Sequence, residues 1–298
     1  MSDAPWRIRA LRGLLRRLPR GRYRALAAAP DRGRFTARLA DEVGGAMFDC
    51  DLSDLLSREV CFTGLYEPPV TRVFQRHLRP GGTVIDVGAN WGYFTLLAAA
   101  AVGPTGAVVS LEPDPRQFET LTRNVEMNAF SHVTAIRAAA SARPGRITLV
   151  GYADDEENRG VTRIAAARDA AAPGVTRQFD VDGVTIDGLM PPVREVDLVK
   201  IDVEGAEDLV LEGMREGLSL RRYRALLLEL HPGLLEARGV DPASCISLLQ
   251  EYGYRGWTID ASPGAYRRAI APDRSIEPLL RPLEEWRQTP WPHLLWLC

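Results

Sequence analysis

The chain has 298 residues, a formal net charge of −2, 46% hydrophobic residues and 26% charged residues, a composition typical of an ordinary globular protein. It contains no run of the roughly 20 uncharged apolar residues that a membrane-spanning helix requires, and its arginine-rich start lacks the apolar core of a secretory signal. The 4 cysteines show no metal-binding spacing and suit a reducing cytosol. These features exclude a membrane channel and a secreted disulfide scaffold, and we expect a cytoplasmic protein.

Residues 1–58 are predicted to form a basic, helical extension ahead of the main domain at 59–298. Between Met1 and Ala40 the sequence has eleven arginines and two aspartates, a net charge of +9. The apolar residues of this stretch recur near helical spacing: Trp6, Ile8, Leu11, Leu14, Leu15 and Leu18. A solvated basic face is the simpler interpretation, and a helix lying on an anionic membrane or an acidic partner is the alternative. Nucleic acid is not an expected partner, because the remaining chain is acidic and carries no recognised nucleic-acid-binding motif.

Residues 59–260 alternate short β-branched runs with helical segments, a pattern typical of a parallel sheet with crossover helices. In chain order the predicted strands are 83–87, 107–111, 132–138, 196–203 and 225–231, with closing strands at 254–259 and 293–298. The predicted helices are 93–102, 115–128, 205–213 and 243–252. The second helix has the clearest start, because Asp114 is a favourable N-cap and Pro115 suits the first helical position. The last forty residues contain many prolines and are expected to be mostly loop before the final strand.

One connection, residues 143–192, is too long for a simple crossover between strands. It contains an acidic, polar tract at 154–160. Long connections of this kind are often functional, so we expect this tract to form an exposed loop over the site.

A glycine-containing turn joins the first predicted strand to its helix and reads Asp-Val-Gly-Ala-Asn-Trp-Gly from Asp86 to Gly92. Such a turn lets a cofactor approach the backbone beside a helix N-terminus. The spacing is GxxxG, with Asn90 in place of the second glycine of the dinucleotide pattern GxGxxG. The sequence therefore favours a cofactor without a pyrophosphate over NAD. Asp86, at the strand end, is a candidate acceptor for a hydrogen bond from an ammonium group.

The second predicted strand ends in Glu112 and Pro113. A carboxylate at this position can accept hydrogen bonds from both hydroxyls of an adenosyl ribose. Together with the glycine turn, Glu112 indicates a cofactor that contains adenosine.

The fourth predicted strand ends in Lys200-Ile201-Asp202-Val203-Glu204-Gly205. Strand alternation places Lys200 and Asp202 on the same face. Buried ionisable groups are costly unless they are paired or functional. For Lys200 an internal ion pair with a carboxylate competes with a catalytic role. Asp202 is predicted to face the glycine-containing turn at 86–92, which is called the cofactor turn below.

The fifth predicted strand ends in Glu229-Leu230-His231, and alternation again places the two ionisable residues on one face. His231 is a candidate base for a substrate hydroxyl, with Glu229 orienting it. Two alternatives stay open: a divalent ion bound by Asp202, Glu229 and His231, and a strand-end histidine satisfied by backbone groups. The ligand spacing is not diagnostic, so no metal is predicted. The other histidines have no acidic companions in sequence and are expected to be structural or exposed: His77, His132 and His293.

These residues resemble the FkbM-type family of S-adenosylmethionine-dependent methyltransferases. The matching blocks occur in order over about residues 59–260: Gly64-Leu65-Tyr66-Glu67-Pro68, Asp86 to Phe94, Leu111-Glu112-Pro113, Leu121-x-x-Asn124-x-x-x-Asn128, Val184 to Leu189, Lys200 to Glu207, and Glu229-Leu230-His231. The Lys-Ile-Asp-Val-Glu-Gly block is the motif that is specific for this family. The glycine turn alone would indicate only the wider methyltransferase class.

The resemblance implies an α/β, Rossmann-like class I methyltransferase fold: a mostly parallel, seven-stranded sheet with helices on both faces and an antiparallel final strand. It implies S-adenosylmethionine as the cofactor, and O-methylation of a sugar, glycan or natural-product hydroxyl as the reaction. The implied cofactor residues are Asp86, Gly88, Asn90 and Gly92 around the methionine portion, Glu112 with Pro113 at the ribose, Tyr66 and Glu67 at the methionine end, and Asp202 near the sulfonium. The residues expected around the acceptor are Asp202, Glu204, Glu229 and His231, with Asp202 or His231 as the base.

Two other classes stay open on the sequence alone. One is a nicotinamide-dependent oxidoreductase, which the GxxxG spacing disfavours. The other is a non-catalytic scaffold that keeps the methyltransferase fold, which only a turnover measurement can decide. The sequence also leaves open the identity of the acceptor, metal dependence and the formation of a homo-oligomer.

Overall fold

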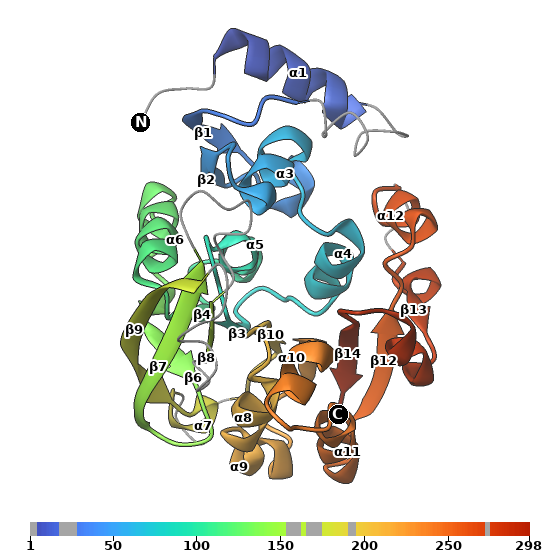
Figure 1. Ribbon diagram of the computed structural model, residues 1–298. Coiled ribbons are helices and arrows are strands. Elements are labelled where there is room, and N and C mark those ends of the chain that lie inside the picture. The colour runs from blue at the N-terminus through green and yellow to red at the C-terminus, as the bar shows by residue number, and fades with distance from the viewer. Residues whose placement is uncertain (1–4, 18–28, 153–161, 165–174, 190–194, 272–274) are drawn as a thin grey trace.

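Figure 1 shows the computed structural model of the chain, in which helices surround a central sheet. The structure describes the chain except residues 1–4, 18–28, 153–161, 165–174, 190–194 and 272–274. The acidic tract predicted to lie over the site, at 154–160, falls outside the described residues.

The central sheet has eight strands in the order β13-β12-β14-β11-β10-β3-β4-β5. They are β3 (Thr83–Val87), β4 (Ala107–Leu111), β5 (Val133–Ile136), β10 (Leu198–Ile201), β11 (Ala225–Glu229), β12 (Arg255–Ile259), β13 (Leu280–Arg281) and β14 (His293–Leu297). The strands from β11 to β5 are parallel, and β14 runs antiparallel between β11 and β12. All the predicted strands and the antiparallel final strand are confirmed. The short β13 adds an eighth strand that the sequence did not indicate.

Two hydrophobic clusters cover the two faces of this sheet, because successive side chains of a strand point to opposite faces. Val84 of β3 packs in one cluster with α4 and α5, and the next residue, Ile85, packs in the other with α8, α9 and α11. The helices are α1 (Trp6–Arg17), α3 (Leu55–Thr63), α4 (Pro68–Arg76), α5 (Tyr93–Val102), α6 (Pro115–Met127), α7 (Ile186–Leu189), α8 (Glu207–Glu212), α9 (Arg215–Ser219), α10 (Pro232–Ala237), α11 (Ala243–Glu251) and α12 (Pro263–Ala269). The predicted helices on both faces are therefore confirmed.

Local sequence signals set the boundaries of the elements nearest the cofactor turn. The α6 helix begins as predicted, because Asp114 Oδ1 accepts the N–H of Arg116 at 2.9 Å and Pro115 takes the first helical position. The predicted bounds of β3, β4 and α5 also agree with the structure.

The long connection forms a second sheet, in the order β6-β9-β7-β8. Its strands are β6 (Ala138–Ala140), β7 (Gly145–Tyr152), β8 (Thr162–Ile164) and β9 (Val175–Val184). In Figure 1 this sheet lies beside the carboxyl ends of the central strands, on the same side as α6. The strands β7, β8 and β9 were not predicted, because the antiparallel pairing of β7 with β9 joins segments that are distant in sequence.

The N-terminal extension is part of the main hydrophobic cluster. Besides α1 and α3 it contains an antiparallel pair, β1 (Arg34–Arg38) and β2 (Met47–Asp51), so it is not purely helical. Two asparagines of α6 hold β2: Asn124 Oδ1 accepts the N–H of Asp49 at 2.7 Å, and Asn128 Oδ1 accepts the N–H of Met47 at 2.7 Å. The asparagine block therefore serves to dock the extension, and the domain boundary at residue 58 stays a prediction.

The basic helix α1 has one face against the protein body. Ile8 is buried there, and Arg12 donates to the carbonyl oxygens of Cys61 and Arg38 at 2.6 and 2.7 Å. Trp6 and Leu14 are 68% and 58% exposed. Contact with a membrane or an acidic partner stays a prediction, which now depends on these two side chains. In the described parts of the chain, no helix is long and apolar enough to cross a membrane.

Candidate active site

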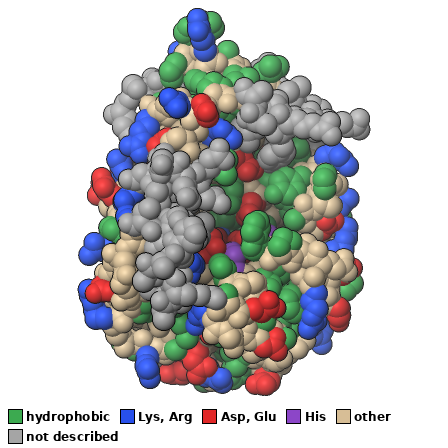
Figure 2. Space-filling model, in the orientation of Figure 1, with side chains coloured by type: hydrophobic (Ala, Val, Ile, Leu, Met, Phe, Trp, Pro, Cys, Tyr) green, Lys and Arg blue, Asp and Glu red, His purple; other side chains and the backbone are tan. Residues whose placement is uncertain are grey.

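A pocket of about 410 Å³ lies at the carboxyl ends of β3, β4, β10 and β11, which is within the range of roughly 300–1,000 Å³ common for ligand sites. Figure 2 shows acidic and histidine side chains at the bottom of a hollow in the middle of this face. Nine of the predicted site residues line the pocket: Tyr66, Glu67, Gly88, Asn90, Glu112, Pro113, Asp202, Glu204 and Glu229. The topology therefore brings most of the predicted set together.

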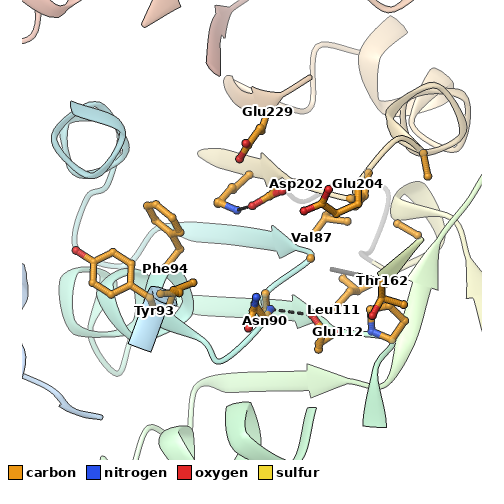
Figure 3. A pocket seen from close by; sticks show the side chains of 18 of the residues that line it. Val87, Asn90, Tyr93, Phe94, Leu111, Glu112, Thr162, Asp202, Glu204 and Glu229 are labelled. Carbon is orange, nitrogen blue, oxygen red and sulfur yellow. Dashed lines mark hydrogen bonds and ion pairs between the residues drawn. The ribbon is translucent and has the colours of Figure 1, made fainter. Parts of the chain in front are cut away.

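Glu112 is buried at the end of β4 and accepts two backbone hydrogen bonds. The N–H of Asn90 donates to Oε2 at 2.8 Å, a contact drawn in Figure 3, and the N–H of Asp114 donates to Oε1 at 2.9 Å. Burial outweighs these hydrogen bonds and raises the pKa of Glu112 to about 8. A carboxylate oxygen has more than one lone pair, so each oxygen can still accept a ribose hydroxyl. The residues at this end therefore fit an adenosyl group.

Two of the predicted cofactor residues are not among the lining residues. Asp86 is fully buried, and its Oδ2 accepts a hydrogen bond from Thr95 Oγ1 at 2.7 Å. Its other oxygen has no hydrogen-bond partner among the described residues. Gly92 begins α5 with a φ of 88°, and a Cβ there would lie 2.6 Å from Leu121 Cδ1. Asp86 and Gly92 therefore lie outside the pocket and stabilise the cofactor turn through contacts with Thr95 and Leu121.

The ion pair considered for Lys200 is present. Lys200 Nζ donates to Asp202 Oδ2 at 3.0 Å and lies 4.8 Å from the centre of the Phe94 ring. Burial opposes the charge on Lys200, but the charges of Asp202 and Asp86 outweigh it and raise the pKa of the lysine. Burial also opposes ionisation of Asp202, yet Lys200 lowers the pKa of its carboxyl. Asp202 is therefore a carboxylate stabilised by a lysine, which makes it a weak base.

His231 does not line the pocket. Its Nδ1 lies 2.7 Å from Glu207 Oε1, and its Nε2 lies 3.4 Å from Glu204 Oε2 and 3.7 Å from Glu229 Oε1. Burial alone would lower the pKa of His231, but the hydrogen bond to Glu207 and the charge of Glu204 raise it to about 10. An imidazolium has no free lone pair for a proton, so this geometry does not support the prediction of His231 as the base.

Glu204 and Glu229 present carboxyl groups that titrate near neutral pH. Burial, reinforced by the charge of Asp202, raises the pKa of Glu229 to about 8, and burial raises the pKa of Glu204 to about 7. Figure 3 shows Glu229, Asp202 and Glu204 on one side of the pocket and Asn90 with Glu112 on the other. The pocket thus has a side that fits the cofactor and a carboxylate-rich side for an acceptor.

Backbone strain is concentrated at this pocket. Asn90, Glu204 and Glu67 have φ values of 50°, 51° and 41°, in the left-handed region that residues other than glycine rarely adopt. Strain of this kind persists where the surrounding structure imposes it, and it is found most often at functional sites.

Several lining residues carried no signal of their own in the sequence. They are Asp54, Leu55, Leu56 and Glu59 at α3, Ile147, Leu149, Thr162, Arg163 and Ile164 in the second sheet, and Tyr266 in α12. The length of the connection at 143–192 indicated that something covers the site there. Nothing in the sequence pointed to α3 or α12.

Two groups of side chains have possible ligand atoms within 4.8 Å of one another: Asp202 with Glu229 and His231, and Glu67 with Glu229 and His293. In both groups the histidine nitrogens lie at ion-pair distance from carboxylates. In each group a protonated histidine can therefore balance the charge of the carboxylates. We assign neither group to a metal.

The parallel sheet, the cofactor turn after β3 and the acid at the end of β4 define a class I, Rossmann-like methyltransferase. Residues 86–255 match the family model described as the methyltransferase FkbM domain. The chain therefore belongs to the FkbM methyltransferase family, and its methyl donor is S-adenosylmethionine. This assignment replaces the nicotinamide-dependent alternative.

Several known proteins are similar to this chain. Methyltransferase 1 of Beauveria bassiana (strain ARSEF 2860) is 28% identical over 186 residues, which is 57% of this chain and 71% of the relative. The 31-O-demethyl-FK506 methyltransferase FkbM of Streptomyces tacrolimicus is 29% identical over 214 residues, 61% of this chain and 77% of the relative. The crystal structure of the methyltransferase FkbM from Methylobacillus flagellatus KT matches with a TM-score of 0.42 and 15% identity, over 93% of this chain and 58% of that chain.

Proposed function

We propose that this methyltransferase transfers a methyl group to a hydroxyl oxygen of a sugar, glycan or related natural-product acceptor, with Glu229 as the general base. The observation that carries the proposal is the Glu229 carboxyl, which lines the acceptor side of the pocket and has a pKa raised to about 8. A positioned carboxylate of this basicity can take a hydroxyl proton while the new bond forms. The relative from Streptomyces tacrolimicus is named for methylation at an oxygen of FK506, which supports the same class of reaction.

S-adenosylmethionine, when bound, supplies a methyl group that its sulfonium already makes electrophilic. The protein therefore has to position two reactants and remove one proton. Glu112 and the backbone of Asn90 would hold the adenosyl end, with Tyr66 and Glu67 at the other end of the cofactor. In the net change the hydroxyl becomes a methyl ether, the methyl–sulfur bond of the cofactor breaks to leave a thioether, and the hydroxyl proton passes to Glu229 and then to water.

The walls of the acceptor side suit a hydroxyl-rich molecule. Tyr266 lines the pocket together with Glu204 and Glu229. Carboxylates accept hydrogen bonds from hydroxyl groups, and aromatic rings pack against the apolar faces of a ligand. This combination favours a sugar-like acceptor over a purely apolar one.

Incubation of the purified protein with methyl-tritiated S-adenosylmethionine and a panel of acceptors tests the proposal. The panel holds glycosides and polyols in one arm and amines and thiols in the others. We expect label in a glycoside or polyol, recovered as a methyl ether. The Glu229→Gln variant should lose about 100-fold or more in turnover while it keeps its affinity for S-adenosylmethionine. Glu236→Gln, at an exposed position of α10, is the matched control.

Two results would contradict the proposal. Label found only on nitrogen or sulfur would show a different acceptor class. Cofactor binding without transfer to any arm of the panel would favour the non-catalytic scaffold.

A further inference from the structure

His293 lies beside Glu229 although the two residues are far apart in sequence. The antiparallel strand β14 places His293 directly opposite Glu229 of β11 in the register. Directly opposite residues of an antiparallel pair point to the same face of the sheet. His293 is buried and is not among the residues that line the pocket, so it lies behind Glu229. His293 has no acidic companion nearby in the sequence, and strand pairing brings Glu229 beside it.

The imidazole of His293 bridges two glutamates. Its Nδ1 lies 3.6 Å from Glu229 Oε2, and its Nε2 lies 3.5 Å from Glu67 Oε1. Glu67 precedes α4 and is held in the left-handed region with a φ of 41°. The three residues come from three elements, β11, β14 and the start of α4, and form a glutamate–histidine–glutamate row that ends at the acceptor side of the pocket.

We propose that His293 is a positioning residue which, as an imidazolium between Glu67 and Glu229, orients the Glu229 carboxyl group and favours its ionised form. The inference rests on the proposed role of Glu229 as the base. A buried carboxyl group is favoured in its neutral form, and a neutral carboxyl cannot take the acceptor proton. A cation beside the carboxyl shifts this balance toward the carboxylate. Glu67, at the other nitrogen, fixes the orientation of the ring.

The charges around the row agree with this role. Burial would lower the pKa of His293, but the charges of Glu229 and Glu67, with a smaller contribution from Asp202 of β10, raise it to about 9. The charges of Asp202 and Glu67 act on Glu229 in the opposite sense and favour its neutral form, whereas His293 and His231 favour the carboxylate. His293 is thus a cation at neutral pH, and its removal would raise the pKa of Glu229 further.

Nuclear magnetic resonance of the full chain tests the ion pairs without any acceptor. The chain has only 4 histidines, so imidazole ¹⁵N signals of labelled protein can be assigned by substitution. We expect His293 to titrate near pH 9, and Glu229→Gln and Glu67→Gln each to lower that midpoint by a unit or more. Glu236→Gln should leave it unchanged. A midpoint near the ordinary value of about 6.5 that does not respond to Glu229→Gln would overturn the proposal.

The carboxyl side of the pair is measured with ¹³C-labelled glutamate, the Glu229 signal being identified by its loss in Glu229→Gln. His293→Gln should raise the Glu229 midpoint by a unit or more. The control is His132→Gln, because His132 Nε2 contacts the carbonyl oxygen of Ala99 at 2.9 Å, away from this row. An unchanged Glu229 midpoint in His293→Gln would also overturn the proposal.

The pH profile of methyl transfer, measured with a glycoside from the acceptor screen, separates positioning from a structural role. His293→Gln should lose activity at pH 7 and recover much of it above pH 9, with unchanged affinity for S-adenosylmethionine by calorimetry. His293→Lys, which restores a cation, should move the profile back toward the wild type. Equal loss at every pH would mean a structural role. If no acceptor is found, the proposed function fails while the resonance measurements still decide the role of His293.

Discussion

The carbonyl oxygen of Asp202 lies directly against Gly88, so that a Cβ at Gly88 would be 1.7 Å from it. The two residues follow the neighbouring parallel strands β3 and β10, and the N–H of Asp202 donates to the carbonyl oxygen of Val87 at 3.0 Å. Gly88 also has a φ of 76°, which glycine adopts without strain. The cofactor turn and the acceptor side of the pocket therefore meet at a contact that only glycine allows.

Gly88→Ala should consequently cost much more stability than an alanine at another left-handed glycine. Gly239→Ala is the matched control, because Gly239 has a φ of 81° but a Cβ there would have nothing within 4 Å. The control should lose only the conformational term, about 1–2 kcal/mol. Gly88→Ala should lose several-fold more and should also weaken binding of S-adenosylmethionine. Urea unfolding and calorimetry measure both quantities, and equal losses in the two variants would mean that the contact with Asp202 does not matter.

Glu112→Gln should weaken binding of S-adenosylmethionine roughly tenfold or more, because a buried unsatisfied polar group costs about 1–3 kcal/mol. Both oxygens of Glu112 accept backbone N–H groups, and the amide NH₂ of glutamine would face one of those donors. Glu119→Gln is the control, since Glu119 is exposed on α6. Calorimetric titration with S-adenosylmethionine checks the result, and unchanged affinity in Glu112→Gln would remove Glu112 from the cofactor site.

Arg177→Met should loosen the second sheet. Arg177 of β9 pairs with the fully buried Asp114, and Thr162 of β8 lies 3.2 Å from the same carboxylate. Removing one partner of a buried pair leaves an uncompensated charge, at a cost of about 3–5 kcal/mol. Arg146→Met breaks the exposed pair with Asp182 in the same sheet and should cost at most about 1 kcal/mol.

Hydrogen exchange of residues 145–184 and urea unfolding compare these two variants. Faster exchange should appear in Arg177→Met alone. Because the backbone N–H of Asp114 also holds Glu112, the same variant should bind S-adenosylmethionine more weakly. Equal behaviour of the two variants would contradict a tether between the second sheet and the cofactor site.

The pH dependence of stability should reveal the protonated state of His231. Its pKa rises from 6.5 to about 10 on folding, so the folded protein binds this proton more tightly than the unfolded chain. The resulting stabilisation is fully present below pH 6.5 and is lost as the pH rises toward 10. His231→Gln should therefore flatten the fall in unfolding free energy over this range, whereas His132→Gln should not. Parallel curves for wild type and His231→Gln would show that His231 is neutral in the folded protein.

Much of the cofactor side was predictable from the sequence because its signals are local. Asp114 and Pro115 mark a helix start, and Glu112 follows a short β-branched run. The carboxyl ends of neighbouring parallel strands meet at one edge of the sheet, so residues at successive strand ends were expected to converge. The same rule brought Asp202 and Glu229 to the pocket.

The acceptor side was less predictable, because it depends on contacts between distant segments. Tyr266 and the residues of α3 reach the pocket through packing that leaves no periodic signal. The second sheet was not predicted, since the pairing of β7 with β9 is non-local. His231 was expected to be a base, but its protonation depends on burial and on Glu207, which alternation along its own strand does not reveal.

The sequence by itself determined the α/β sheet, the family, and the strand-end residues that form most of the pocket, because hydrophobic periodicity, helix caps and strand-end acids act over a few residues. Only the tertiary structure decided which of those groups carry charge and which are bases. Ionisation is set by burial and by neighbours in space. His293 shows this most clearly, since it acquires Glu229 and Glu67 as neighbours only when β14 inserts antiparallel beside β11.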